Sequence, residues 1–136
     1  MKASGYLLDT NILSHILKQP KGSAAMRLRE VACNNIFTSI IVAAELQFGI
    51  KKKASSKLQQ RVKLLLDTIE ILDFKTPADI YYGEIRHYLQ KAGMLIGPND
   101  LLIAAHALSE NLIIVTDNVR EFERVPNLLV ENWLQE

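Results

Sequence analysis

Three aspartates in this sequence stand where an apolar run ends or where a helix is expected to begin. Asp9 follows the run GYLL, Asp117 follows LIIVT, and Asp100 falls in the first turn of the helix predicted for GPNDLLIAAHAL. A carboxylate buried without a partner costs free energy, so each of these positions needs an explanation. Because ligands of open parallel sheets collect beyond the carboxyl ends of the strands, we expect Asp9 and Asp117 to mark such an edge.

A fourth acid, Glu45, has apolar neighbours at helical spacing. Ile41 lies four residues before it and Phe48 lies three residues after it, so this helix is predicted to carry Glu45 inside its apolar stripe. Carboxylates that converge repel one another and raise their own pKa values unless a divalent cation is present. Oxygen ligands of this kind favour Mg²⁺ or Mn²⁺ over zinc.

One or two metal ions in such a site can activate water and stabilise the oxygens of a phosphodiester, which indicates a nuclease. Each acid also has an ordinary explanation, namely a helix cap for Asp9, the helix dipole for Asp100, a turn for Asp117 and an ion pair for Glu45. Coincidence at all four positions is the weaker explanation. Short polar side chains beside the acids are candidates to orient metal-bound water or a phosphate oxygen: Thr10, Asn11, Asn99, Thr116 and Asn118.

Length and composition set the broad class of the protein. The chain has 136 residues, of which 49% are hydrophobic, so we expect residues 1–136 to form a single domain. A net charge of +1 predicts no general attraction to nucleic acid or membranes. The lone Cys33 excludes an internal disulfide and is expected to be a buried apolar residue. No stretch approaches the roughly 20 apolar residues of a membrane span, and no signal peptide is apparent, so we expect a soluble cytoplasmic protein.

Short apolar runs alternate with longer segments of helical period, which predicts an α/β fold with a mostly parallel sheet. Ser39 is the predicted cap of the third helix, and Thr76 is the predicted cap of the fifth, with Pro77 in its first turn. The expected strands cover residues 5–8, 36–38, 69–72, 113–116 and 128–130. The expected helices cover residues 11–18, 23–32, 40–52, 56–68, 76–92 and a segment from residue 98 onward.

Four segments, in this order and spacing, resemble a known family: LLDTNIL, AAELQFG, GPNDLLIAAHAL and VTDNVREFERVPNLLVENWL. They are similar to the PIN-domain ribonucleases and, among these, to the VapC toxins of bacterial type II toxin–antitoxin modules. The resemblance implies a PIN-like α/β/α sandwich with a central, mostly parallel sheet of four to five strands, an acidic Mg²⁺ or Mn²⁺ site, and endoribonuclease activity on structured RNA. It also implies a tRNA anticodon loop as candidate substrate, inhibition of translation, a homodimer, and a VapB antitoxin as partner.

Carried over by motif, the resemblance implies that Asp9, Glu45 and Asp100 are catalytic, metal-binding carboxylates. Many relatives place the last acid two residues after the threonine of the VT strand. Here that position is Asn118, whereas Asp117 comes one residue after the threonine. Two possibilities stay open: Asp117 supplies a fourth metal-binding, catalytic carboxylate, or three acids act with Asn118 as a polar accessory. We favour Asp117.

Basic side chains outside the acidic motifs are candidates for contact with RNA or the antitoxin. Lys51 and Lys52 belong to a lysine-rich run, and phosphate contacts supply much of nucleic-acid affinity. A solvated helix face is the simpler explanation for this run. Arg86 and His87 lie on the predicted fifth helix, which in the family lines the groove or the dimer contact.

Two further residues are expected to be structural. His106 follows LLIAA and is predicted to pack inside the fold, since a metal-based nuclease needs no histidine base. Trp133 is predicted to anchor the terminal segment against the domain.

Two rival functions remain open from the sequence. A phosphatase of the haloacid-dehalogenase type also uses Mg²⁺ and an aspartate after its first strand, but it needs a second aspartate where this chain has Asn11. A non-catalytic PIN-like binding module is the other possibility. Glu45 argues against that module, because pure binding gives no reason to keep an acid among apolar residues.

Overall fold

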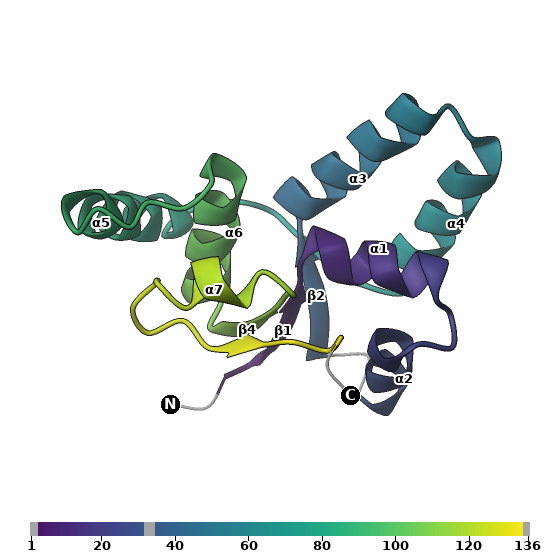
Figure 1. The fold of residues 1–136 in the computed structure, drawn as a ribbon, viewed down its shortest axis with the longest axis horizontal. Coiled ribbons are helices and arrows are strands. Elements are labelled where there is room, and N and C mark those ends of the chain that lie inside the picture. The colour runs from purple at the N-terminus through teal and green to yellow at the C-terminus, as the bar shows by residue number, and fades with distance from the viewer. Residues whose placement is uncertain (1–2, 32–34, 135–136) are drawn as a thin grey trace.

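The computed structural model describes residues 3–31 and 35–134, and in this part of the chain five strands form one parallel sheet (Figure 1). The predicted α/β fold with a parallel sheet of four to five strands is confirmed. The strands are β1 (Gly5–Leu8), β2 (Ile36–Ser39), β3 (Glu70–Leu72), β4 (Leu112–Val115) and β5 (Val130–Glu131), in the order β3-β2-β1-β4-β5. The helices are α1 (Thr10–Lys18), α2 (Ser23–Glu30), α3 (Ile40–Lys53), α4 (Ser56–Leu66), α5 (Ala78–Lys91), α6 (Pro98–Ser109) and α7 (Val119–Phe122).

The centre of the sheet is the pair β1 and β4. Gly5–Leu8 pairs in parallel register with Leu112–Val115, and the Asp9 amide continues the ladder by donating to the Val115 carbonyl at 2.9 Å. Strand order runs outward from this pair in both directions, which makes it the topological switch point of the sheet. Asp9 and Thr116 therefore leave the sheet side by side at its carboxyl edge.

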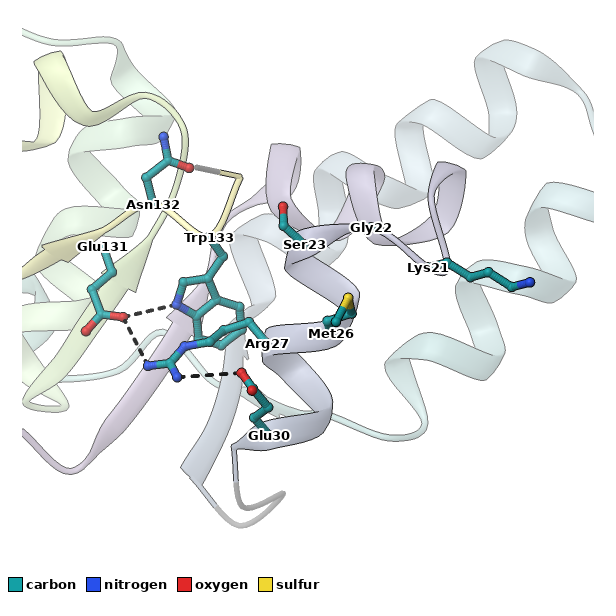
Figure 2. Close-up of a pocket in the computed structure, with 9 residues that line it drawn as sticks. All are labelled: Lys21, Gly22, Ser23, Met26, Arg27, Glu30, Glu131, Asn132 and Trp133. Atoms are coloured by element: carbon teal, nitrogen blue, oxygen red, sulfur yellow. Dashed lines mark hydrogen bonds and ion pairs between the residues drawn. The ribbon is translucent and has the colours of Figure 1, made fainter. Parts of the chain in front are cut away.

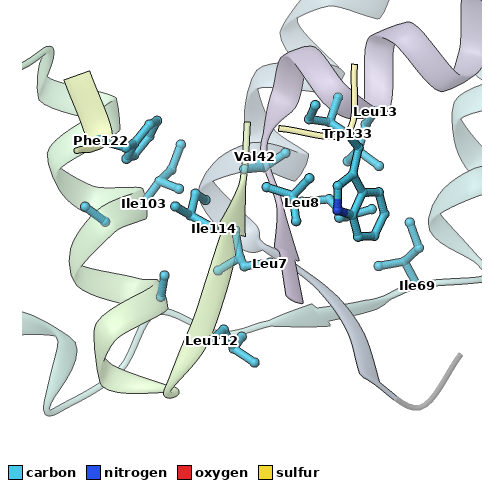
Figure 3. Close-up of a cluster of buried hydrophobic side chains, with 14 of the residues drawn as sticks. Leu7, Leu8, Leu13, Val42, Ile69, Ile103, Leu112, Ile114, Phe122 and Trp133 are labelled. Atoms are coloured by element: carbon cyan, nitrogen blue, oxygen red, sulfur yellow. The ribbon is translucent and has the colours of Figure 1, made fainter. Parts of the chain in front are cut away.

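Helices cover both faces of the sheet and bury an apolar core. Figure 1 shows α5 and α6 on one side and α1, α2 and α4 on the other. Leu7 pairs with Ile114 and shares its face, whereas Leu8 points to the opposite face toward Trp133 (Figure 3). All four side chains are buried, so both faces of β1 are sealed by apolar contacts. None of the helices in the described residues is long and apolar enough to cross a membrane.

The ends of several elements differ from the sequence prediction. Ser39 caps α3 as predicted by accepting from the Ile41 amide at 3.0 Å, but the predicted cap at Thr76 is wrong. The helix α5 begins at Ala78, whose amide donates to the Lys75 carbonyl at 2.9 Å, so a backbone turn precedes the helix instead. The predicted ends near Ala32 and the predicted burial of Cys33 lie outside the described residues.

The C-terminal segment is fixed to the domain by Trp133, as predicted. Its indole is 4% exposed and meets the Tyr6 ring edge-on at 5.3 Å between centroids. The indole Nε1–H donates to Glu131 at 3.0 Å, and the Arg27 guanidinium lies over the ring at 5.8 Å (Figure 2). Arg27 also forms ion pairs with Glu131 at 4.0 Å and with Glu30 at 3.9 Å. We call this region between α2 and the C-terminal segment the α2 pocket.

Candidate active site

The four predicted acids converge beyond the carboxyl edge of the sheet. Asp9 follows β1, Asp117 follows β4 by two residues, Asp100 lies in the first turn of α6, and Glu45 lies in the middle of α3. All four line one cavity of about 520 Å³, which we call the acidic pocket. The parallel pairing of β1 with β4 thus brings together carboxylates that are far apart in the chain.

Asp9 is the most deeply placed of these acids, with 4% of its surface exposed. Its Oδ1 accepts from the Thr10 amide at 2.8 Å, which caps α1, and its Oδ2 accepts from the Thr116 hydroxyl at 2.8 Å. Burial raises the pKa of Asp9, and the negative charges of Glu45 and Asp117 raise it further, against the lowering effect of these hydrogen bonds. Helix capping explains part of its role but leaves this crowding of like charge unexplained.

Glu45 lies on the rim of the pocket, and its predicted place inside the apolar stripe of α3 is wrong. The buried face of the helix is formed by other residues, among them Val42 and Leu46, while Phe48 is 69% exposed. Of the apolar neighbours from which the stripe was predicted, Ile41 packs partly against the core and Phe48 does not, so these two residues lie at the margin of the buried face. Glu45 is half-buried between them, where its Oε1 accepts from the Thr10 hydroxyl at 2.6 Å.

Asn99 completes the contacts of Glu45, and the same helix carries Asp100. The Asn99 amide group donates to Glu45 Oε2 at 3.2 Å. The pKa of Asp100 is raised to about 7, first by burial and then by the negative charges of Asp9, Glu121 and Glu45. Asp100 is therefore both partly buried and close to other carboxylates, and each of these conditions disfavours its ionised form.

Asn118 links Asp100 to an acid that the sequence did not single out, Glu121. The Asn118 amide group donates to Asp100 Oδ2 at 3.1 Å and also to Glu121 Oε2. Glu121 also accepts from the Gly97 amide at 3.2 Å, at the start of α6, and the hydrogen bond from Asn118 is the main cause of its lowered pKa. The sequence signal for Glu121 was its position three residues after Asn118, which is the spacing of neighbours on one face of a helix. This signal was missed because the helix α7 has only four residues and is too short to show a hydrophobic period.

Both candidates for the fourth position contribute to the site, in different ways. Asp117 is exposed, lines the acidic pocket and accepts a hydrogen bond from the Asn11 amide group. Asn118 holds Asp100, and its backbone amide donates to the Thr116 hydroxyl at 3.0 Å. The structure thus places a carboxylate at Asp117 and a polar accessory at Asn118.

The predicted basic contacts lie elsewhere on the molecule. Lys51 and Lys52 are exposed in the last turn of α3, and His87 is exposed on α5. Arg86 lies over Tyr82 of its own helix and donates to the Tyr82 hydroxyl at 2.9 Å. None of the four is among the residues that line the acidic pocket, so their contact with RNA or antitoxin stays a prediction.

His106 packs inside the fold, as predicted. It is fully buried, its Nδ1 lies 2.7 Å from the Ser39 hydroxyl, and its ring meets Phe74 edge-on at 5.4 Å between centroids. Burial lowers its pKa, which favours the neutral imidazole.

The chemistry of the pocket fits a hard divalent cation, although the side chains do not form a closed metal site. Within the described residues, no three acidic, histidine or cysteine side chains are grouped closely enough to hold an ion as they stand. Yet the pocket offers four carboxylates, and Asn11 Oδ1 is buried without a hydrogen-bond partner in the described part of the chain. An all-oxygen donor set suits Mg²⁺ or Mn²⁺.

Comparison with known proteins agrees with this geometry. The PIN domain family matches residues 6–128. Ribonuclease VapC2 of Rickettsia felis is 45% identical over 130 residues, which cover 94% of this chain and 97% of that protein. The tRNA(fMet)-specific endonuclease VapC of Salmonella typhimurium is 35% identical over 129 residues, with 94% and 97% covered.

Solved structures show the same relationship. The crystal structure of VapBC2 from Rickettsia felis bound to a DNA fragment from their promoter superposes with a TM-score of 0.87 at 43% identity, covering 94% of this chain and 98% of that one. The DNA-bound VapBC structure from Salmonella typhimurium gives a TM-score of 0.84 at 33% identity, with 98% and 99% covered. This chain therefore belongs to the PIN-domain family and, within it, to the VapC ribonucleases.

Proposed function

We propose that this protein is the toxin of a type II toxin–antitoxin module and acts as an Mg²⁺- or Mn²⁺-dependent endoribonuclease. The observation that carries the proposal is the convergence of Asp9, Glu45, Asp100 and Asp117 in one pocket at the switch point of a parallel sheet. The described residues form no ion pair with these four carboxylates, and burial together with nearby negative charge raises the pKa of Asp100 to about 7. A divalent cation supplies the missing positive charge.

In this proposal the four carboxylates hold the metal, which when bound activates water and stabilises the oxygens of the phosphodiester. The surrounding residues fix the carboxylates in place. The Thr116 hydroxyl orients Asp9, the Thr10 hydroxyl orients Glu45, and the Asn118 amide group orients Asp100. Such outer contacts would keep the carboxylates in place to hold an ion.

Structured RNA is the proposed substrate, with a tRNA anticodon loop as the proposed cleavage site and inhibition of translation as the result. Support comes from the relative of Salmonella typhimurium, which is named as an endonuclease specific for tRNA(fMet). The related crystal structures contain VapBC complexes, which supports a VapB-type antitoxin as the partner of this chain. We also propose that residues 1–136 act as a single domain, as a homodimer in the cytoplasm. Exposed Tyr81 and Tyr88 on α5 support the dimer.

Incubation of purified protein with total bacterial tRNA tests the function. Parallel reactions contain Mg²⁺, Mn²⁺ or EDTA, and the ends of the fragments are identified by sequencing. We expect cuts at one loop in the presence of metal, no cuts with EDTA, and at most trace cutting at the same loop with Asp9→Asn. Metal-independent cutting, or equal cutting by the variant, contradicts the proposed use of these carboxylates.

A further inference from the structure

One wall of the acidic pocket is formed by α1 and carries a cation. Ser14, His15 and Lys18 of this helix line the pocket together with the acids. Ser14 and Lys18 are four residues apart, so their side chains extend from the same face of the helix. None of the three was a candidate from the sequence, because α1 has no motif beyond its first two residues.

Lys18 differs in charge from the rest of the pocket. Lys18 lines the same pocket as the four carboxylates. In the part of the chain that the structure describes, it forms no ion pair. A cation near the carboxyl end of a helix is favoured by the helix dipole, which explains a lysine at the end of α1. The dipole does not explain why this lysine lies on the wall of the pocket.

The helix turn that carries Lys18 is held firmly. The Gln19 amide donates to the His15 carbonyl at 2.8 Å and closes the last turn, while the Arg61 guanidinium of α4 donates to the Leu17 carbonyl. Gly22 lies so close to the His15 ring that an added Cβ would come within 2.9 Å of Cε1. The backbone at Lys18 is thus fixed relative to the acids, whereas its exposed side chain is free to meet a ligand.

We propose that Lys18, with the Ser14 hydroxyl beside it, binds a phosphodiester of the RNA next to the one that is cleaved. This inference rests on the proposed nuclease function. Four carboxylates repel an RNA backbone, and a metal ion held by them attracts only the phosphate at the reacting bond. A lysine ammonium is a compact charge that binds phosphate, and a serine hydroxyl donates to phosphate oxygens. The α1 wall thereby sets the register of the strand across the site.

Steady-state cleavage of total bacterial tRNA with Mn²⁺ provides the first test. We expect Lys18→Ala to raise KM about tenfold with little change in kcat, because a charge-assisted contact to the bound strand is lost. Lys18→Arg keeps the charge and should restore most of the affinity. Lys21→Ala is the matched control, since Lys21 is an exposed lysine three residues further on that lines the α2 pocket instead.

Binding without cleavage provides the second test and keeps the two proposals separate. Fluorescein-labelled tRNA is titrated with Asp9→Asn protein, with and without Lys18→Ala, across a salt series. Loss of one phosphate contact should lower the slope of log affinity against log salt by about one unit. Unchanged affinity and slope overturn the role of Lys18, even where the parent protein cleaves RNA. If the parent protein binds but does not cleave, the nuclease function fails, and the salt slope still decides whether Lys18 holds a phosphate.

Discussion

The acidic pocket and the α2 pocket both contain carboxylates, but only the α2 pocket neutralises them. There, Arg27 lies between Glu30 and Glu131 and also covers the indole of Trp133. In the acidic pocket the described residues form no ion pair with any of the four acids, and hydroxyl and amide groups hold the carboxylates instead. Both pockets contain acids, so the presence of acids does not distinguish a candidate active site from a structural contact. The difference is that the acids of the acidic pocket have no ion-pair partner among the described residues.

The largest expected effect is a loss of stability caused by a substitution in the α2 pocket. Trp133→Ala removes a buried indole and leaves a cavity beside Tyr6, so we expect the free energy of unfolding to fall by about 3–5 kcal/mol. Urea unfolding monitored by circular dichroism measures this loss. Leu64→Ala, at a largely exposed position on α4, should cost far less. Equal losses in both variants contradict the anchoring role of Trp133.

The second largest expected effect is a loss of activity, and only substitutions in the acidic pocket should cause it. Asp9→Asn should lower kcat/KM for tRNA cleavage by about a hundredfold to a thousandfold, because a carboxylate that balances and orients the metal is lost. The metal-free variant should be as stable as the parent or more stable, since repulsion with Glu45 and Asp117 is relieved. Glu131→Gln, which removes a carboxylate from the α2 pocket, should leave cleavage unchanged. Comparable losses of kcat/KM in both variants would contradict the proposal that only the acidic pocket takes part in cleavage.

A third effect concerns pH. The pKa of Asp100 is about 7 in the folded protein and 3.8 ordinarily, so the folded form retains a proton that the unfolded form has released. Stability is therefore complete below the ordinary value and is lost as pH rises through the raised one. After allowance for solvent screening, we expect a loss of about 1–2 kcal/mol between about pH 4 and about pH 7 in EDTA.

Asp100→Asn isolates this contribution. The difference in unfolding free energy between parent and variant should grow with pH in EDTA and shrink when Mn²⁺ is added, because the ion binds the folded carboxylates. Thermal melts of both proteins at matched pH values measure it. A parent and a variant with parallel pH profiles would show that Asp100 does not carry the repulsion.

The smallest effect should come from breaking the ion pairs of the α2 pocket. Arg27→Met removes ion pairs at 3.9 and 4.0 Å between partly exposed groups and the contact of the guanidinium with the Trp133 ring, so the unfolding free energy should fall by about 1 kcal/mol. Cleavage should be unaffected. A high-salt melt provides the control, since salt should narrow the gap between parent and variant.

The sequence predicted the placement of the acids at the ends of strands and helices better than the placement of the acid inside a helix. Asp9 and Asp117 follow apolar runs, and parallel pairing of those runs is enough to bring the acids together. Glu45 was misplaced because its apolar neighbours Ile41 and Phe48 lie at the margin of the buried face of α3, and hydrophobic period does not distinguish that margin from the centre. Glu121 was missed because α7, with four residues, is too short to show a hydrophobic period. Lys18 was missed because its place beside the pocket depends on how α1 packs in the fold.

The order of strands also determines when the acidic pocket can form during synthesis. β1 is synthesised long before its neighbour β4, which begins only at Leu112. A nascent chain that ends before β4 already contains Asp9, Glu45 and Asp100, yet it lacks Thr116, which fixes Asp9, and the segment that carries Asp117. The site is therefore complete only after β4 and the segment behind it have been synthesised and β4 has paired with β1.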